Sequence, residues 1–414
     1  MTDHAAVLRT ASSSSFAPTA IDRLARRAVL ARLARISRGR LAVHEGAHVQ
    51  AFGESSPDLS ATIRVRDPRF YRWLAQRGSL GGAEAYLEGL WSTDDLVAVV
   101  RVLARNQAAL AGLDAGLARI ARPGLRMLHL LRRNTRGGSR RNVAAHYDLG
   151  NAFFEIFLDP TLTYSAGVFE RADATLEEAQ IAKYRRAIDA LRLGPDDHVL
   201  EIGTGWGGFA IHAARTTGCR VTSATLSAEQ HARATERVAA AGLADRVEVV
   251  LRDYRDLRGR FDKLVSIEMI EAVGHAQLPG YFRACSERLR PGGRMFLQAI
   301  TVPERDFAAS VRNVEFIKRY VFPGGQLVSV GAICDAIARA GSDLQITALG
   351  DVTEHYATTL RIWRERYLAA QAQVAALGFD ERFRRLWEFY LAYCEGGFRE
   401  RAIGTIQLTL VRPN

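Results

Sequence analysis

An apolar strand that runs directly into a glycine-rich turn most constrains the fold of this chain. Residues 199–208 read VLEIGTGWGG, and Gly203, Gly205 and Gly207 alternate with larger residues. Glycines at these positions let the backbone turn tightly and approach a bulky ligand closely. Residues 209–215 are predicted to form a helix whose N-terminus directs free N–H groups toward that ligand. The pattern therefore indicates a nucleotide-like cofactor site.

The residues that flank the turn narrow the identity of the cofactor. Glu201 precedes the glycines, at the carboxyl end of the strand, where its carboxylate can accept hydrogen bonds from a cofactor. A dinucleotide site would need an acidic residue about 20 positions on, but the expected strand at 220–226 contains none. The spacing E-x-G-x-G-x-G after a strand is frequent in methyltransferases, so S-adenosylmethionine fits better than NAD. A plain strand–helix turn is the alternative that this pattern leaves open.

Positive charge is concentrated in the N-terminal third of the 414 residues. Residues 1–141 hold 23 arginines against 11 acidic residues, and this excess accounts for the net charge of +11. Such a region is expected to meet a polyanion, either nucleic acid or an anionic membrane surface. Within it, residues 21–36 combine helical apolar spacing with five arginines. This segment either lies on a membrane or packs against the core with a solvated arginine face.

The basic, glycine-containing segment 132–141 is expected to link two domains. Residues 1–131 would form a smaller, mainly helical domain that docks on lipid or membrane. Residues 142–414 would form the catalytic domain, in which strands and helices alternate. This alternation predicts a Rossmann-like α/β domain with a seven-stranded, mostly parallel sheet and a closing hairpin. The expected strands are 198–202, 220–224, 247–251, 264–267, 294–300, 345–349 and 405–411, with a chain break at 291–293 and a helical insertion at about 303–340.

The chain shows no sign of export or of a metal site. No run of 18 apolar residues occurs, and the N-terminus lacks the apolar core of a secretory signal. The four cysteines are scattered without a C-x-x-C pair, as expected for buried thiols in a reducing cytosol. No His, Asp or Cys cluster has metal-ligand spacing. We therefore expect a cytoplasmic protein that associates peripherally with the inner face of the membrane.

Blocks outside the glycine turn resemble the cyclopropane-fatty-acyl-phospholipid synthase family of S-adenosylmethionine-dependent enzymes. The resemblance covers about residues 135–412 and implies a class I methyltransferase fold. The blocks are HYDLGN at 146–151, FLDPTLTYS at 157–165, EMIEAVGH at 268–275, FIKRYVFPGG at 316–325 and HYATTL at 355–360.

The resemblance also implies which residues contact the cofactor. In this family a Thr-Leu-Ser segment, here 225–227, takes the place of the missing acid after the second strand. Core packing is the alternative for Tyr254, and it is the favoured one for Ile267. The implied contacts are Tyr164, Ser165, Gly203, Gly205, Thr225, Leu226, Gln230, Asp253, Tyr254 and Ile267.

The chemistry that the resemblance implies is alkylation of a lipid double bond, which needs no protein nucleophile. The double bond of an unsaturated acyl chain attacks the sulfonium methyl, and a base then removes a proton to close a cyclopropane ring. In the family a bound bicarbonate is this base, and its ligands correspond to Glu271, Tyr356 and the backbone of Ile300. Two positions depart from the family: Ala166 replaces a cysteine and Gln298 replaces a histidine. Ala166 can still offer its backbone N–H, whereas Gln298 can donate a hydrogen bond but cannot take up a proton.

These departures leave the product open between a cyclopropane and a methyl or methylene branch. Glu271 could act as the base directly if burial raises its pKa. The alternative for Glu271 is a carboxylate near a helix N-terminus, because Glu268 and Glu271 lie three residues apart after the fourth strand. His146 and His275 are weaker candidates.

Three other functions compete with lipid alkylation. The basic N-terminal region would also suit a nucleic-acid methyltransferase that acts on RNA, but it has few aromatic residues for base stacking. Relatives of this fold methylate small-molecule amines. A non-enzymatic, lipid-binding relic is the third alternative, and the retained Tyr164, Gln230, Glu271 and Tyr356 argue against it. The resemblance further suggests a homodimer.

Overall fold

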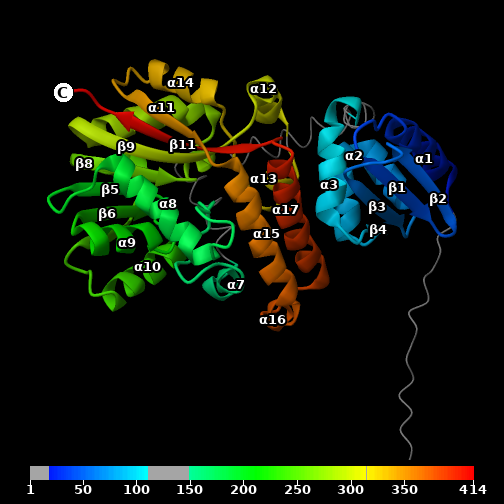
Figure 1. Cartoon of the computed structure of the whole chain (residues 1–414), viewed down its shortest axis with the longest axis horizontal. Coiled ribbons are helices and arrows are strands. Elements are labelled where there is room, and N and C mark those ends of the chain that lie inside the picture. The colour runs from blue at the N-terminus through cyan, green and yellow to red at the C-terminus, as the bar shows by residue number, and fades with distance from the viewer. Residues whose placement is uncertain (1–17, 111–148, 314) are drawn as a thin grey trace, which may run out of the picture.

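The computed structural model describes residues 18–110, 149–313 and 315–414, and it contains two sheets (Figure 1). The larger sheet has seven strands in the order β10-β11-β9-β8-β5-β6-β7. Its strands are β5 (His198–Ile202), β6 (Arg220–Thr225), β7 (Val247–Leu251), β8 (Phe261–Ile267), β9 (Leu289–Thr301), β10 (Gln345–Asp351) and β11 (Gly404–Val411). The strands from β5 to β9 pair in parallel, while β11 runs antiparallel to both β9 and β10. The predicted seven-stranded, mostly parallel sheet is confirmed. In place of the predicted closing hairpin, β10 and β11 form an antiparallel pair whose strands are separated in the chain by three helices.

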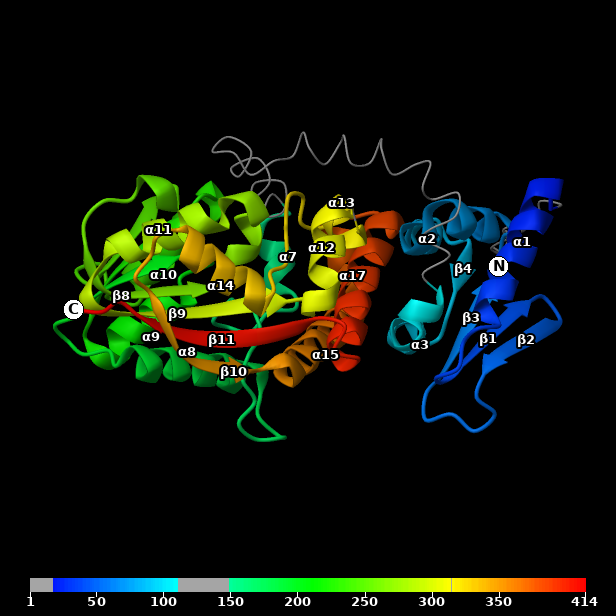
Figure 2. The ribbon, with the colours of Figure 1, turned by 90° about the horizontal axis from the view of Figure 1, so that it is seen from above.

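Helices cover both faces of this sheet, as Figure 2 shows from above. One apolar layer includes residues of α8 (Leu176–Leu191), α9 (Gly208–Thr217) and α10 (Ala228–Ala240). The opposite layer includes residues of α11 (Leu278–Arg288) and α14 (Val330–Arg339). Because α14 belongs to this layer, the segment predicted as a helical insertion also supplies part of the ordinary sheet cover.

The start of β9 differs from the prediction. A break at 291–293 was expected before a strand beginning at 294, but β9 begins at Leu289 and passes through those residues. The pairing of β8 with β9 shifts register between Phe261 and Lys263, and Gly292 adopts a φ of +74°. A glycine in this conformation lets the strand absorb an irregularity that would otherwise end it.

A helical pair stands at the end of the large sheet. It consists of α15 (Thr353–Ala369) and α17 (Glu381–Arg399), which pack against each other. In the sequence, both helices lie between β10 and β11. The sequence pattern predicts helices at 358–375 and 380–392 between the last two strands, and the structure has them, although α15 begins and α17 ends outside these bounds. Shorter elements complete this part of the chain: α7 (Asn151–Glu155), α12 (Glu304–Arg312), α13 (Phe316–Tyr320), α16 (Gln371–Ala376) and the 3-10 helices η1 (Tyr254–Asp256), η2 (Ile270–Ala272) and η3 (His275–Gln277).

The N-terminal region contains a four-stranded sheet as well as helices. Its strands follow the order β2-β1-β3-β4, and β1 pairs antiparallel with β2. The prediction of a mainly helical domain missed this β1-β2 hairpin because most β2 residues are exposed and show no apolar alternation. The elements are α1 (Ala20–Leu33), β1 (Arg40–Glu45), β2 (His48–Gly53), β3 (Ser60–Val65), α2 (Arg69–Leu87), β4 (Trp91–Ser92) and α3 (Leu96–Arg105).

Helix α1 combines features of both alternatives considered for residues 21–36. Val29 and Leu33 are buried in the core, and Arg26 forms an ion pair with Glu45. In contrast, Ile21 and Leu24 at the start of the helix are 60% and 69% exposed. The C-terminal half of α1 therefore packs against the domain, while its first turns present apolar side chains to solvent.

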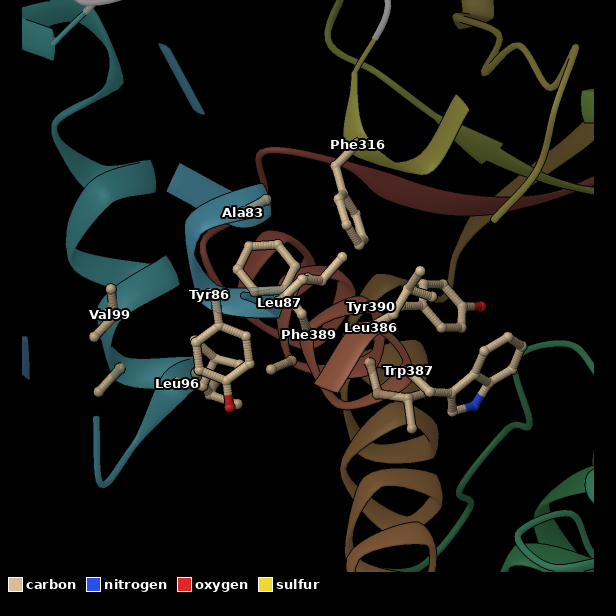
Figure 3. Packing of buried hydrophobic residues seen from close by; sticks show 14 of the residues in the cluster. Ala83, Tyr86, Leu87, Leu96, Val99, Phe316, Leu386, Trp387, Phe389 and Tyr390 are labelled. Atoms are coloured by element: carbon tan, nitrogen blue, oxygen red, sulfur yellow. The ribbon is translucent and has the colours of Figure 1, made fainter. Parts of the chain in front are cut away.

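Helix α17 packs against both the N-terminal region and the part of the chain that holds the large sheet (Figure 3). The Phe389 ring lies 5.7 Å from Tyr86 of α2 and 4.8 Å from Phe316 of α13. A side chain at Gly396 would place its Cβ 2.6 Å from Val100 of α3, so only glycine permits this close approach. The predicted linker at 132–141 lies outside the described residues. Among the helices that the structure describes, none is both long and apolar enough to cross a membrane.

Candidate active site

The glycine turn between β5 and α9 has backbone angles that favour glycine. Gly203, Gly205 and Gly207 adopt φ values of +105°, +52° and +84°. At Gly208, an added Cβ would lie 2.3 Å from the Tyr184 hydroxyl. The first three positions therefore favour glycine because of their backbone conformation, and Gly208 requires it because there is no space for a side chain.

Side chains from other elements hold the glycine turn in place. The buried Trp206 donates from Nε1 to Oδ1 of Asn151 at 2.7 Å. Arg237 of α10 donates from Nη1 to the Trp206 carbonyl at 2.7 Å. Both bonds hold Trp206, and with it the middle of the turn, in one position.

Glu201 lies at the end of β5 in a buried polar group. The hydroxyl of Ser223 in β6 donates a hydrogen bond to the Glu201 carboxylate, and its Oγ lies 2.7 Å from Oγ1 of Thr204. Burial raises the pKa of Glu201 to about 8. A cofactor hydroxyl that donates to this carboxylate would favour its charged form.

The other predicted cofactor residues on the sheet follow the ends of neighbouring strands. At the end of β6, Thr225 donates to Oε1 of Gln230 at 2.9 Å, and Leu226 follows directly. After β7, Asp253 accepts from Nε of Arg255 at 2.8 Å, and the Arg255 guanidinium lies over the Tyr254 ring. Ile267 is the last residue of β8. Parallel strands bring their carboxyl ends to one edge, where α/β proteins bind ligands.

The predicted residues Tyr164 and Ser165 lie in the chain before α8. The Tyr164 hydroxyl is 2.8 Å from that of Tyr390 in α17, and its ring stacks on Trp363 at 5.2 Å. Ser165 accepts from Nζ of Lys183 at 2.6 Å. Lys183 is fully buried, and this burial lowers its pKa to about 7. Sequence reasoning missed Lys183 and the helix α8 that carries it, although the apolar residues around Lys183 in the sequence were a visible signal.

A second polar group, which we call the carboxylate cluster, lies after β8 and consists of Glu268, Glu271 and the groups that donate to them. Glu268 accepts three hydrogen bonds from distant parts of the chain. The donors are the backbone N–H of Ala166 at 2.9 Å, Nε2 of Gln298 at 2.8 Å and the Tyr356 hydroxyl at 2.7 Å. Burial raises the pKa of Glu268, and the three donors together with protonated Lys183 oppose this rise.

Glu271 has a different environment from Glu268. Its Oε1 accepts from the backbone N–H of Ile300 at 2.6 Å, and its Oε2 is buried without a hydrogen-bond partner. Burial, followed by the charge of Glu268, raises the pKa of Glu271 to about 8. At neutral pH this carboxyl is mainly protonated.

The arrangement of these residues differs from the expected bicarbonate site. Ala166, Gln298 and Tyr356 were expected to surround an ion together with Glu271, but their donor groups converge on the Glu268 carboxylate. Gln407 donates to Oε1 of Gln298 at 2.8 Å, which turns the Gln298 amide so that Nε2 faces Glu268. An added anion would compete for donors already bonded to a carboxylate and would face a second glutamate. These residues therefore do not fit bicarbonate.

The two polar groups lie next to each other. Strands β5 and β8 pair in parallel, so the glycine turn and the carboxylate cluster follow the same ends of adjacent strands. A Cβ on Gly203 would come within 3.1 Å of Cβ of Met269, the residue after Glu268. A ligand seated on the turn would consequently lie close to the carboxylate cluster.

Aromatic rings, which we call the aromatic wall, extend from the carboxylate cluster: Tyr164, Phe322, Tyr356, Trp363 and Phe398. Tyr356 stacks on Phe398 at 4.4 Å and meets Trp363 edge-on at 6.2 Å. The ring of Tyr164 lies 6.3 Å from Phe322. Sequence reasoning identified only the two tyrosines of this wall.

The remaining candidate residues have other surroundings. His146 lies outside the described residues, and His275 begins η3 with its ring 5.3 Å from Phe307. No group of three or more His, Cys, Asp or Glu side chains in residues 18–110, 149–313 and 315–414 could hold a metal ion.

Comparison with known proteins agrees with this architecture. A family model described as mycolic acid cyclopropane synthetase matches residues 134–408. The chain is 41% identical to tuberculostearic acid methyltransferase UfaA1 of Mycobacterium tuberculosis (strain ATCC 25618 / H37Rv), covering 87% of this chain and 86% of that protein. It is 36% identical to the cyclopropane-fatty-acyl-phospholipid synthase of Escherichia coli (strain K12), covering 85% and 88%.

A solved structure is also similar. The mycolic acid cyclopropane synthase CmaA1, crystallised with SAH and CTAB, superposes with a TM-score of 0.61 at 33% sequence identity. The match covers 66% of this chain and 98% of that one.

Proposed function

This chain belongs to the mycolic acid cyclopropane synthetase family, and from that premise we propose that it alkylates unsaturated fatty acyl chains of membrane phospholipid. It is an S-adenosylmethionine-dependent methyltransferase. In the proposed reaction the methyl carbon of the cofactor is added across an acyl double bond to give a cyclopropane. The observation that carries the proposal is the contact of Tyr356 with both the carboxylate cluster and the aromatic wall, beside the glycine turn.

The glycine turn and its neighbours suit S-adenosylmethionine. This cofactor supplies an electrophilic methyl group on a positively charged sulfur. Gly203 and Gly205 leave the backbone free of Cβ atoms, and Glu201 offers a buried carboxylate at the adjacent strand end. Tyr164 and Ser165 would approach the cofactor from the chain segment that precedes α8.

The aromatic wall suits a reaction that passes through a cation on the acyl chain. Aromatic faces attract positive charge, and a closed apolar surface excludes the water that would trap the cation as an alcohol. Trp363 is fully buried and Tyr356 nearly so. The side chains here would also align the double bond with the methyl group, which lowers the entropic part of the barrier.

The N-terminal domain would place the enzyme on an anionic membrane. Ile21 and Leu24 are exposed on α1, and Arg23 and Arg27 lie exposed on the same helix. Apolar side chains flanked by arginines suit insertion at a lipid interface. We retain peripheral association with the cytoplasmic face of the membrane, and the homodimer, as predictions that accompany this proposal.

The test incubates the purified full chain with methyl-labelled S-adenosylmethionine and liposomes of monounsaturated phospholipid. We expect acyl chains that gain one labelled methylene unit and show the high-field proton signals of a cyclopropane. A methyl or methylene branch would retain acyl alkylation and change the product. Unmodified acyl chains together with a methylated small-molecule amine would overturn the proposal.

A further inference from the structure

We propose that the Glu268 carboxylate is the catalytic base of this enzyme and replaces an external bicarbonate ion. This inference rests on the proposed function, because a base is needed only if a proton leaves the alkylated chain. It starts from the disagreement between the expected bicarbonate ligands and the groups that they contact in the structure.

The geometry around Glu268 is that of a bound anion supplied by the protein itself. Three donors from three separate segments converge on its two oxygens: Oε1 receives Ala166 and Gln298, and Oε2 receives Tyr356. Donor groups directed at one point stabilise a negative charge there and fix its orientation. A diffusing anion would need the same donors.

The neighbouring Glu271 completes a division of roles between two carboxyl groups. Glu268 has three donors and the nearby Lys183, which favour its charged form, whereas Glu271 has one backbone donor and a buried oxygen without a partner. Burial raises the pKa of both carboxyl groups, but these donors oppose the rise at Glu268 more than the single donor does at Glu271. Two carboxyl groups in environments that differ in this way can take different protonation states, with Glu268 as the one favoured to carry the charge. Glu271 would then be a neutral positioning residue that holds the backbone of Ile300.

The backbone of Glu268 provides an independent observation. This residue adopts a φ of +49°, a left-handed conformation that non-glycine residues rarely occupy. Such strain persists only where the surroundings enforce it, and it is frequent at functional sites. The fold therefore retains a glutamate at a position where the backbone alone would favour glycine.

The proposed step balances in atoms and charge. The alkene forms a bond to the methyl carbon, the carbon–sulfur bond breaks, and its electron pair leaves with sulfur as a neutral thioether. The positive charge then resides on the acyl chain. Glu268 takes a proton from the added methyl group, the electrons of that C–H bond close the ring, and the carboxylate becomes a neutral acid.

The test compares the wild-type enzyme with Glu268→Gly and Glu268→Gln in buffers stripped of carbon dioxide, with and without added millimolar sodium bicarbonate. We expect wild-type turnover to stay within about twofold between the two buffers. Without bicarbonate, the turnover of both variants should be lower than that of the wild type by at least about 100-fold, because they lack the base. Added bicarbonate should raise the turnover of Glu268→Gly by at least about tenfold, because glycine opens space for the ion. Sodium chloride at equal ionic strength should restore neither variant.

A second readout does not depend on lipid products. Binding of carbon-13 bicarbonate, followed by NMR, should occur in Glu268→Gly and not in the wild type. If the wild type makes no alkylated lipid but this binding difference appears, the proposed function fails while the replacement of the ion by Glu268 stands. Affinity for S-adenosylhomocysteine, measured by calorimetry, should stay within about threefold in all three proteins because Glu268 is not expected to hold the cofactor.

Folding of the glycine variant has a matched control. Arg192 is another non-glycine residue with positive φ, at +54°, and it ends α8 away from the cluster. Arg192→Gly and Glu268→Gly should both fold. Bicarbonate-dependent wild-type turnover, bicarbonate binding by the wild type, or a folded Glu268→Gly enzyme that keeps a third of its activity without bicarbonate would each overturn the proposal.

Discussion

The glycine turn at 203–208 and the carboxylate cluster around Glu268 lie at the same edge of the sheet but are built in opposite ways. The turn comes from six consecutive residues whose backbone angles determine its shape. The cluster brings together groups that lie far apart in the sequence, among them the Ala166 backbone and the Tyr356 side chain, so its geometry depends on the whole fold. The comparison teaches that a backbone site can be recognised from adjacent residues, whereas a side-chain site requires the distances between distant ones.

The largest expected effect is a change in the turn that leaves the cluster intact. Gly203→Val forces a β-branched residue to φ +105° and places its Cβ 3.1 Å from Met269. We expect affinity for S-adenosylhomocysteine to fall by about 100-fold, since strain at such positions costs roughly 1–3 kcal/mol before the contact is counted. Calorimetry measures this. Gly280→Ala is the control, because Gly280 lies in α11 with open space around it and should bind normally.

The next change breaks the cluster and leaves the turn intact. Tyr356→Phe removes the hydroxyl that donates to Glu268. A hydrogen bond to a charged group is worth roughly 1.5–3 kcal/mol, so we expect kcat to fall by about 30-fold with cofactor affinity unchanged. Tyr367→Phe, in the same helix, removes a hydroxyl that donates to the Arg384 carbonyl and should leave kcat unaffected. Equal losses in both variants would contradict a specific role for Tyr356.

These two regions also show how much of the molecule could be predicted. The large sheet and the glycine turn follow from local patterns, and the seven-stranded architecture is confirmed. Glu268 was recognised only as a neighbour of Glu271, because nothing in EMIEAVGH indicates which carboxylate Gln298 and Tyr356 reach. The β1-β2 hairpin was missed for a different reason, since its exposed residues lack an apolar period.

The pH dependence of stability tests the different environments of the two glutamates. The pKa of Glu271 rises from 4.5 to about 8 on folding. The folded state therefore holds an extra proton between these values, and stability falls as pH rises through that window. Glu271→Gln cannot titrate and should be about 1–2 kcal/mol more stable than the wild type at about pH 9. Chemical unfolding measures this difference.

A control separates this effect from general charge effects. Glu354→Gln, at an exposed site, should follow the wild-type pH profile. The pKa of the buried Glu201 is also raised to about 8, so the stability of the Glu271→Gln variant should still fall somewhat as pH rises. A wild-type stability that stays constant across the window would show that Glu271 is ionised in the folded protein.

The smallest expected effect tests how far support for the cluster extends. Gln407→Leu removes the donor that orients the Gln298 amide. Because Gln298 keeps its own bond to Glu268, we expect kcat to fall by only about threefold, less than the usual net value of one hydrogen bond. Thr409→Val, two residues along β11, is the control and should keep wild-type turnover in the same liposome assay.

The positive φ of Glu268 has a consequence for how such enzymes diverge. Glutamate and glycine codons differ at their second base alone, and the backbone here already suits glycine. One point mutation could therefore exchange a built-in base for dependence on an ion from the medium without disturbing the fold. A lineage could cross between these two states in a single step, and its lipid modification would gain or lose sensitivity to dissolved carbon dioxide.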